Sequence, residues 1–293
     1  MRWLSNILLL WVAAPTLLSV VIFYQLESFE PAQLPIHDSL IAPTAPNLNL
    51  KLNILRGVEK VGTGKIMGPE DVAYDAESKL IYTGCADGWI KRVRVDDLSV
   101  EDWVNSGGRP LGLVLGPDKR LIVADANKGL LRVNENVEVE VLTDEAEGVK
   151  FGLTNGVDAS DDKLGLGLGG TIYFTDASYK YRLKDFIWDM LEGRPYGRLL
   201  SYDPSTNQTK ILLSDLYFPN GVALSQDQTF LVFCETPLRR CMKYMIEGEG
   251  KGTVEKFIDV DGFPDNIQYD RIEGVYWIGL ASVSNFNKKK LRF

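Results

Sequence analysis

Alternation of apolar and polar residues dominates the chain from about residue 68 onward. Short runs rich in Val, Ile, Leu, Tyr and Phe, such as residues 72–75 and 80–84, are separated by turns that contain Asp, Asn or Gly. Strands of roughly four to eight residues bounded by such turns are typical of antiparallel sheets. The pattern therefore predicts an all-β fold.

The same two-strand unit recurs along the chain, with one aligned position at the start of its first strand. Successive aligned positions are 41, 44, 65 and 45 residues apart. A period of roughly 40–45 residues, with about four strands per unit, is typical of a β-propeller. A β-sandwich of short strands is the alternative, but it does not explain the period. The aligned residues are Glu70, Leu111, Asn155, Asn220 and Asp265.

The one long interval between aligned positions contains a different pattern. Between residues 179 and 194, the apolar residues Phe186, Ile187, Met190 and Leu191 recur at the spacing of one helix face. We therefore expect one inserted helix near residues 182–192, on one face of the β-domain.

A continuous apolar stretch, rather than an alternating one, occupies residues 4–24. A run of about 20 apolar residues is long enough to cross the hydrocarbon core of a bilayer. Secretory signal peptides have shorter apolar cores, and residues 13–15, Ala-Ala-Pro, are a poor cleavage site. We expect an uncleaved signal anchor that forms an N-terminal membrane helix. A cleaved signal peptide and a buried helix of the soluble domain are the alternatives.

The charges that flank this stretch predict its orientation. Arg2 precedes it, whereas Glu27 and Glu30 follow it, which favours a cytoplasmic N-terminus and a lumenal body. Asn207 begins an N-glycosylation sequon, Asn-Gln-Thr, which fits a lumenal location. We expect a membrane-anchored glycoprotein on the lumenal side of the endomembrane system, at the endoplasmic reticulum, the vacuole or the cell surface.

Composition narrows the classes of function that fit this pattern. The chain of 293 residues carries 40 acidic and 32 basic residues, a formal net charge of −8. It has no concentrated basic stripe before its last residues, which argues against a nucleic-acid partner. His37 is the one histidine and lies in a proline-rich stretch, so a histidine base, a histidine dyad or a metal site of several histidines is disfavoured.

Four of the five aligned positions carry oxygen-bearing side chains. Equivalent positions at the start of the innermost strands of a propeller converge at one end of its central channel. Two carboxylates, Glu70 and Asp265, and two amides, Asn155 and Asn220, would there form a site for a hard cation such as Ca²⁺.

The residues that follow two of these positions, Asp71 and Asn266, are candidates for a further ligand or for holding the ligands in place. The alternative is that Asn-Gly and Pro-Asp are turn dipeptides, placed at strand starts for backbone reasons. Recurrence at the same position of four units argues against that alternative.

Three cysteines are too few to hold a fold of this size together. Cys234 and Cys241 flank six residues of a strand–loop–strand connection, and a lumenal setting permits a disulfide between them. Two merely buried thiols are the alternative. We expect Cys85 to be a small core residue.

Several segments resemble the strictosidine synthase-like family, including its adipocyte plasma membrane-associated protein branch. The segments that carry the resemblance are residues 170–176, 185–192, 197–202, 218–222 and 262–267. That family belongs to the six-bladed calcium-dependent phosphotriesterase superfamily, together with paraoxonases and gluconolactonases. The resemblance covers roughly residues 55–282 and implies a six-bladed propeller. The membrane-anchored N-terminus resembles the same branch.

The resemblance also implies a ligand set. In metal-dependent relatives, a Glu, two Asn and an Asp-Asn pair hold calcium, and these match Glu70, Asn155, Asn220 and the pair Asp265 and Asn266. The histidine dyad of paraoxonases has no counterpart here. Strictosidine synthase uses a glutamate near its final blade, and that segment is absent because the sequence stops 28 residues after Asp265.

Five unit starts against six blades predict a propeller that is truncated in its fifth or sixth blade, with strand edges open to solvent. Covering of the gap by oligomerisation is the alternative. The expected organisation is a cytoplasmic stub and signal anchor at residues 1–26, a proline-rich linker at 27–52, and an incomplete strictosidine synthase-like propeller at 53–293.

Three hypotheses of function follow. The first is a calcium-dependent hydrolase of a small-molecule ester or lactone, with Glu70 or Asp265 as the candidate proton acceptor. The second is an amine–aldehyde condensing enzyme of the strictosidine synthase type, whose catalytic segment is missing here. The third is a non-catalytic, membrane-anchored binding propeller, in which calcium is structural.

Overall fold

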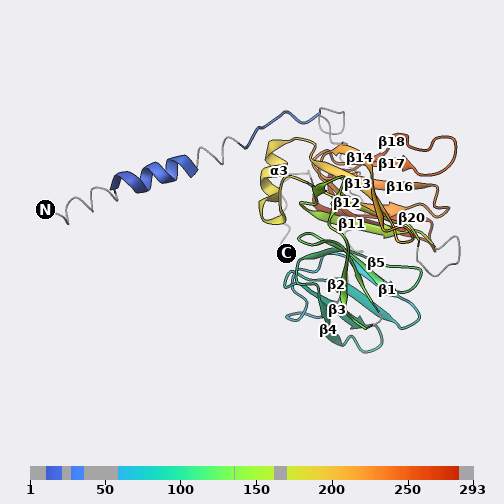
Figure 1. Cartoon of the computed structure of the whole chain (residues 1–293). Helices are drawn as coiled ribbons and strands as arrows, with labels where there is room; N and C mark the ends of the chain where they lie inside the picture. The colour runs from blue at the N-terminus through green and yellow to red at the C-terminus, as the bar shows by residue number, and fades with distance from the viewer. Residues whose placement is uncertain (1–10, 22–27, 36–58, 135, 162–169, 284–293) are drawn as a thin grey trace.

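The computed structural model describes residues 11–21, 28–35, 59–134, 136–161 and 170–283. The body consists of antiparallel sheets with one short helical insertion (Figure 1). The prediction of a mostly-β fold with the architecture of a propeller is therefore confirmed for these residues. His37, the linker at 36–52, residues 53–58 and the tail at 284–293 lie outside the described residues.

Four sheets share one plan, in which four antiparallel strands follow one another in chain order. The first sheet contains β1 (Val72–Asp75), β2 (Leu80–Gly84), β3 (Trp89–Arg94) and β4 (Val100–Asn105). The second contains β5 (Pro110–Leu115), β6 (Leu121–Asp125), β7 (Gly129–Val133) and β8 (Val139–Thr143). The third contains β11 (Thr154–Ala159), β12 (Ile172–Asp176), β13 (Gly197–Asp203) and β14 (Gln208–Leu216). The fourth contains β15 (Pro219–Leu224), β16 (Phe230–Glu235), β17 (Arg240–Met245) and β18 (Val254–Asp259).

Two further sheets have two strands each within the described residues. The hairpin of β19 (Gly262–Asp270) and β20 (Val275–Val283) follows the fourth sheet in the chain. A small hairpin of β9 (Glu145–Ala146) and β10 (Val149–Lys150) connects the second sheet to the third. The five unit starts predicted from the sequence thus begin five successive sheets.

The first strand of each successive sheet lines the channel, and β1, β5, β11, β15 and β19 lie beside one another in that order. These inner strands approach closely because glycine follows three of the aligned positions. A Cβ atom at Gly112, Gly156 or Gly221 would come within 2.5 Å of a backbone atom of the next inner strand. At these positions a side chain would push two sheets apart.

Side chains join the last inner strand to the first. The Asn266 amide nitrogen donates to the Glu70 carbonyl oxygen at 3.2 Å. The Gln268 amide nitrogen donates to the Val72 carbonyl oxygen at 2.8 Å and to the Asp71 carboxylate at 2.9 Å. Two amide side chains of β19 therefore bridge to the chain at the start of β1, and both strands line the channel. The expected truncation of the ring stays a prediction.

The hydrophobic core consists of layers between neighbouring sheets. Leu200 packs with Phe174 and with Leu130 of the second sheet, whereas Leu199 packs with Phe233 of the fourth. Successive residues of a strand point to opposite faces, so Leu199 and Leu200 contribute to two different layers. Full burial of each such side chain contributes about 1.5–3 kcal/mol relative to exposure. These layers hold the inner strands, and hence the channel, in fixed register.

The helical insertion lies between β12 and β13. A single 3₁₀ turn, η1 (Leu183–Asp185), leads into α3 (Phe186–Glu192), which ends at Gly193 in the left-handed conformation with φ 65°. The prediction of an inserted helix near residues 182–192 is therefore confirmed. Because Thr154 of β11 pairs with Asp176 at the end of β12, the insertion leaves the sheet at the end where the inner strand begins.

Residues 11–21 form a helix in which every residue is exposed. Within the described ranges, no helix combines the length and the hydropathy that crossing a bilayer requires. The apolar stretch of residues 4–24 runs past the described helix on both sides, so the membrane anchor stays a prediction. Residues 28–35 lie against the helical insertion (Figure 1).

Two of the cysteines belong to the fourth sheet, the third follows β2 of the first sheet, and the sequon begins in the turn between two strands of the third. Cys234 of β16 and Cys241 of β17 are direct cross-strand partners, and a disulfide of 2.02 Å joins them. Cys85 is a buried free thiol. Asn207 is exposed in the turn between β13 and β14, with φ 53°, and its side-chain oxygen accepts a hydrogen bond from the Tyr202 hydroxyl at 2.8 Å.

Candidate metal centre

The aligned residues lie at the end of the channel where the inner strands begin, which we call the mouth. Asn155 and Asn220 are each the second residue of an inner strand, β11 and β15. Asp265 lies near the start of β19, and Glu70 lies two residues before β1, where its backbone nitrogen donates to the Gly84 carbonyl oxygen. Parallel placement of the inner strands therefore brings the four residues to one end of the channel.

Two of the predicted ligands are in direct contact. The Asn220 amide nitrogen donates to the Asp265 carboxylate at 2.6 Å, so the amide oxygen of Asn220 is turned away from that carboxylate. The strands that carry Asn155 and Asn220 are held together by Thr175. Its hydroxyl accepts from the Gly156 nitrogen at 2.8 Å and donates to the Asn220 carbonyl oxygen at 2.6 Å.

Both amide oxygens at the mouth lack a hydrogen-bond partner. Asn155 is 4% exposed and Asn220 is 6% exposed, and the side-chain oxygen of each is buried without any donor. A buried polar atom without a partner costs roughly 1–3 kcal/mol. Two such atoms on neighbouring inner strands indicate a position where an electron-pair acceptor, such as a cation, would be stabilised.

The charged forms of the two carboxylates at the mouth are destabilised. Burial raises the pKa of Glu70, the nearby Asp265 carboxylate raises it further, and Arg109 opposes the rise. The Arg109 guanidinium lies 3.2 Å from the Glu70 carboxylate. Burial also raises the pKa of Asp265, against the hydrogen bond from Asn220. A cation between these carboxylates would relieve the repulsion that raises the pKa of Glu70.

The donor set fits calcium in chemistry. Carboxylate and amide oxygens are the ligands that Ca²⁺ prefers, and no thiol or imidazole is among them. No group of three or more His, Cys, Asp or Glu side chains in the described part of the chain is arranged to hold a metal ion. A cation site at the mouth would therefore be a mixed one, in which Glu70 and Asp265 would supply charge and Asn155 and Asn220 would supply neutral oxygens.

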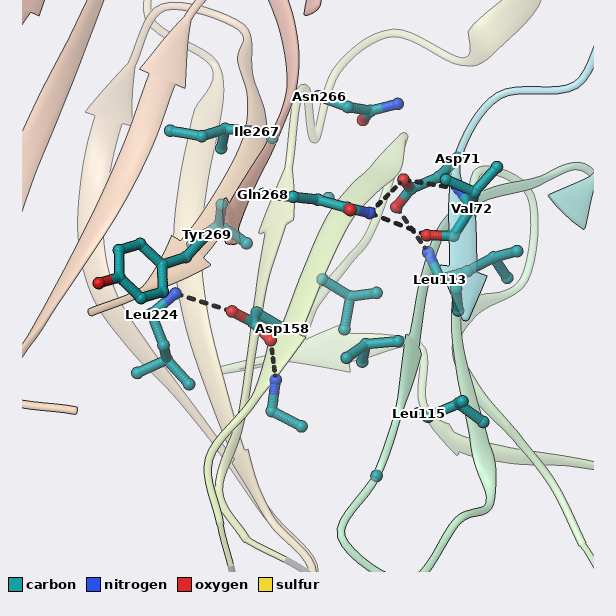
Figure 2. Close-up of a pocket in the computed structure, with 18 of the residues that line it drawn as sticks. Asp71, Val72, Leu113, Leu115, Asp158, Leu224, Asn266, Ile267, Gln268 and Tyr269 are labelled. Carbon is teal, nitrogen blue, oxygen red and sulfur yellow. Dashed lines mark hydrogen bonds between the residues drawn. The ribbon is translucent and has the colours of Figure 1, made fainter. Parts of the chain in front are cut away.

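The two neighbouring candidates, Asp71 and Asn266, turn to other partners. The Asp71 carboxylate accepts hydrogen bonds from the Leu113 and Val72 nitrogens at 3.0 and 2.8 Å, and from Gln268 (Figure 2). Burial raises the pKa of Asp71 to about 6, although these hydrogen bonds oppose the rise. The Asn266 amide nitrogen donates to the Glu70 carbonyl oxygen, two residues before β1. Both residues therefore link neighbouring sheets.

Beyond the mouth, the channel widens into a cavity of about 460 Å³ that all five inner strands line. Asp158 lies on its wall, where its carboxylate accepts hydrogen bonds from the Leu224 nitrogen at 2.7 Å and the Ala159 nitrogen at 2.8 Å (Figure 2). The cavity begins at the residues that follow the aligned positions. The candidate ligands therefore lie next to this cavity, at its mouth end.

An apolar cluster lies at the mouth beside the polar residues. Leu111, the one apolar residue among the aligned positions, packs with Leu153 and Phe218, and Met190 of α3 packs against the same cluster. The rings of Phe186 and Phe218 lie 6.4 Å apart. The helical insertion therefore forms part of the wall of the mouth. It lies beside Leu111, the aligned residue whose side chain has no oxygen.

A second set of acidic residues surrounds the mouth, and the sequence analysis did not single it out. Each residue ends the second strand of a sheet and accepts backbone N–H groups from the loop that precedes the inner strand. Glu235, for example, accepts from the Tyr217 nitrogen at 2.9 Å. The recurrence of an acid at the end of three second strands was the available signal. The set comprises Asp125, Asp176 and Glu235.

Family models match two parts of the chain. The model described as strictosidine synthase matches residues 150–249, and the one described as strictosidine synthase-like, N-terminal, matches residues 53–93. These ranges contain Glu70, Asn155 and Asn220, three of the four oxygen-bearing positions at the mouth.

Curated relatives match more of the chain. Protein STRICTOSIDINE SYNTHASE-LIKE 4 of Arabidopsis thaliana is 52% identical over 274 residues, which cover 92% of this chain and 71% of the relative. The adipocyte plasma membrane-associated protein of Homo sapiens is 35% identical over 245 residues, which cover 78% of this chain and 57% of that protein.

Solved structures share the fold at low sequence identity. A gluconolactonase from Xanthomonas campestris gives a TM-score of 0.60 at 19% identity, covering 73% of this chain and 70% of that one. Regucalcin, a calcium-binding protein from Agrobacterium tumefaciens, gives a TM-score of 0.57 at 16% identity, covering 75% and 70%. These likenesses support the propeller architecture. The curated relatives go further, and on their identity and coverage the chain belongs to the strictosidine synthase-like family.

Proposed function

We propose that this chain is a calcium-binding propeller that hydrolyses a carboxylic ester or a lactone of a small molecule. The observation that carries the proposal is the pair of buried, unpartnered amide oxygens of Asn155 and Asn220 beside the carboxylates of Glu70 and Asp265. Relatives in fold include a gluconolactonase and the calcium-binding protein regucalcin, which supports the same class of chemistry.

Each residue of the mouth has a role in this proposal. Glu70, Asn155, Asn220 and Asp265 hold the cation, and the hydrogen bond from Asn220 orients the Asp265 carboxylate. Asn266 fixes the backbone of Glu70, because its amide nitrogen donates to the Glu70 carbonyl oxygen. Thr175 keeps the strands of Asn155 and Asn220 at a constant separation. The ligands are thus positioned by inner strands that are themselves packed on both faces.

Calcium, when bound, would supply a Lewis acid that polarises the substrate carbonyl. The chain supplies the proton acceptor. The candidates are Glu70 and Asp265, the two carboxylates at the mouth, and both are also proposed ligands. Leu111 and the apolar cluster around it would contact the non-polar part of the substrate.

Thermal melts with calcium and with a chelator test the metal site directly. A ligand that binds only the folded state stabilises it by about 2.7 kcal/mol at roughly a hundredfold excess over its Kd. The parent should gain stability of that order in calcium, and Asp265→Ala should lose most of the gain. Asp75→Ala is the matched control, because Asp75 ends an inner strand at the far end of the channel. Equal calcium gains in the parent and Asp265→Ala would refute the site.

A panel of esters and lactones separates the hydrolase from a binding propeller. Turnover that requires calcium and is lost in Asp265→Ala supports the hydrolase. A calcium gain in stability without turnover of any substrate in the panel would support the non-catalytic alternative. Condensation of an amine with an aldehyde serves as a third assay, because it is the reaction of the enzyme that gives the family its name.

A further inference from the structure

The segment that follows the apolar N-terminal stretch is fixed to the helical insertion. The Lys180 ammonium donates to the Ser28 carbonyl oxygen at 2.7 Å, and the Glu30 nitrogen donates to the Glu192 carboxylate at 2.9 Å. The Ala32 nitrogen donates to the Glu192 carbonyl oxygen at 2.7 Å. Residues 28–35 therefore dock on α3, although more than 140 residues separate the two segments in sequence.

The docking rests on a buried polar cluster. The Glu192 side chain is 0% exposed and lies 2.7 Å from the Lys180 ammonium. It also accepts hydrogen bonds from the hydroxyl groups of Tyr181 and Tyr196. Charge-assisted hydrogen bonds of this kind are about twice as strong as neutral ones. The cluster therefore holds residues 28–32 in one position on the insertion.

This docking limits the distance between α3 and the predicted anchor. Ser28 follows Tyr24, the last residue of the apolar stretch, by four residues. An extended chain spans at most about 3.6 Å per residue, or roughly 14 Å for this connection. Ser28, which is bonded to Lys180 of the insertion, therefore lies within about 14 Å of Tyr24, the end of the apolar stretch.

The outward face of α3 is apolar. Ile187 is 52% exposed, Trp188 is 52% exposed and Leu191 is 59% exposed, whereas Asp189 and Glu192 on the other side of the helix are buried. The ring of Phe29 from the docked segment lies 5.5 Å from the ring of Trp188 and extends this surface. Exposed Arg182 and Lys184 precede the helix. An apolar face with tryptophan at its centre and flanking cations is typical of a surface at the membrane interface.

We propose that the α3 face, which consists of Ile187, Trp188 and Leu191, lies in the headgroup region of the bilayer that holds residues 4–24. The occupant of this face is lipid, because the docked segment leads from α3 into the apolar stretch within a few residues. The propeller is then tethered by the anchor and also oriented by α3, with the channel mouth toward the membrane.

The far end of the propeller agrees with this orientation. The turn that carries Asn207 joins β13 to β14 at the end where the inner strands finish, because Tyr202 pairs with Ile172 at the start of β12. Ile272, which is 97% exposed, lies in the turn between β19 and β20 at the same end. A glycan at Asn207 would point away from the bilayer.

The test uses the full chain in vesicles of phosphatidylcholine and phosphatidylglycerol, with a nitroxide label on a single new cysteine. Ile187→Cys reports on the α3 face, and Ile272→Cys is the matched control, an exposed isoleucine at the opposite end. Cys85 is buried and Cys234 is bonded to Cys241, so the label reads the new site. Neither calcium nor turnover enters the measurement, so its outcome is independent of the proposed hydrolase.

The expected result is a several-fold higher ratio of oxygen collisions to collisions with a water-soluble nickel complex at residue 187 than at residue 272. Adding Trp188→Glu to the Ile187→Cys variant should move the label into water. Equal, water-like accessibility at both positions would overturn the proposal. A label at 187 that is shielded from both reagents would do so as well, because protein would then cover the face. Failure of the chain to remain with the vesicles would also overturn it.

Discussion

Two sets of acidic residues surround the mouth of the channel, and they differ in what satisfies them. The outer set, Asp125, Asp176 and Glu235, is almost fully buried, at 0%, 0% and 1% exposure. The inner carboxylates, Glu70 and Asp265, are less buried, yet they have fewer partners in the structure.

Asp176 illustrates the outer set. Its carboxylate accepts hydrogen bonds from the Gly152 and Leu153 nitrogens at 3.1 and 3.0 Å, and it lies 2.7 Å from the Arg198 guanidinium. Glu70, by contrast, has one ion pair with Arg109 at 3.2 Å. Asp265 has one hydrogen bond from an amide whose own oxygen is unpartnered.

The difference teaches that burial alone does not mark a binding site. A carboxylate that backbone N–H groups and a guanidinium surround has no lone pair to offer a ligand, and it holds loops in place. A carboxylate with few donors, beside unpartnered amide oxygens, has coordination capacity left over. Three experiments test this distinction.

The largest effect is expected when a member of the outer set is removed. Asp176→Ala leaves the Arg198 guanidinium, whose side chain is 4% exposed, without its buried partner. Removing one partner of a buried ion pair typically costs about 3–5 kcal/mol. Urea unfolding should show a loss of that size, while any calcium gain in stability persists. A loss below about 1 kcal/mol would contradict the structural role, and Asp97→Ala, in an exposed turn, is the control.

A smaller, pH-dependent effect is expected at Asp189, an acid with a spare oxygen that lies away from the channel ligands. Burial raises the pKa of Asp189 to about 7, against a hydrogen bond from Ser178, and one of its carboxylate oxygens has no partner. A carboxyl group whose folded pKa exceeds its unfolded value binds its proton more tightly in the native state. Its contribution to stability is therefore greatest at low pH and is lost as the pH rises from about 4 to about 7.

Chemical unfolding across that pH range measures this contribution. The parent should lose stability as the pH rises, and Asp189→Asn, which carries no charge at any pH, should lose less. Calcium should not alter the difference between the two proteins, because Asp189 is not among the proposed ligands. Identical pH profiles for the two proteins would show that folding does not raise the pKa of Asp189.

The smallest effect is expected at Arg109, which lies beside Glu70 in the inner set. Its guanidinium opposes the accumulation of positive charge at the mouth, so Arg109→Gln should strengthen calcium binding. At a partly exposed site the change should be about 1 kcal/mol or less, a few-fold in Kd. Isothermal titration with calcium measures it directly. Weaker binding in the variant would mean that Arg109 orients Glu70 rather than competing with the cation.

The sequence predicted the architecture because its main signal is local and repeated. A period of roughly 40–45 residues and short β-branched strands identify successive sheets without any knowledge of long-range contacts. The inserted helix was predicted for the same reason, since Phe186, Ile187, Met190 and Leu191 define its period. The turn to a 3₁₀ geometry at residues 183–185 moved the start of the α-helix, because helix ends depend on local hydrogen bonds.

The candidate site was predictable only in part. Alignment of the repeats identified Glu70, Asn155, Asn220 and Asp265, because equivalent positions meet at one end of a propeller. It did not show that Asp71 and Asn266 also bond to neighbouring sheets. Those bonds depend on which backbone groups lie within reach, and a single sequence carries no such information.

The contacts between residues 28–35 and α3 were not predictable at all. They join segments far apart in the sequence, and no repeat or motif relates Glu192 to Glu30 or Ala32. The proline-rich character of this region suggested a linker. Its backbone N–H groups instead find a buried carboxylate and a helix carbonyl, which only the folded insertion provides.

The position of α3 at the mouth has a consequence for kinetics. If the mouth faces a bilayer and the chain turns over a substrate, as proposed above, a substrate that partitions into lipid would reach the site by lateral diffusion in two dimensions. The rate then depends on the mole fraction of substrate in the membrane and on the surface area of lipid, rather than on the bulk concentration. Dilution of the lipid phase at constant total substrate would change the velocity, whereas dilution of the water phase would leave it nearly constant.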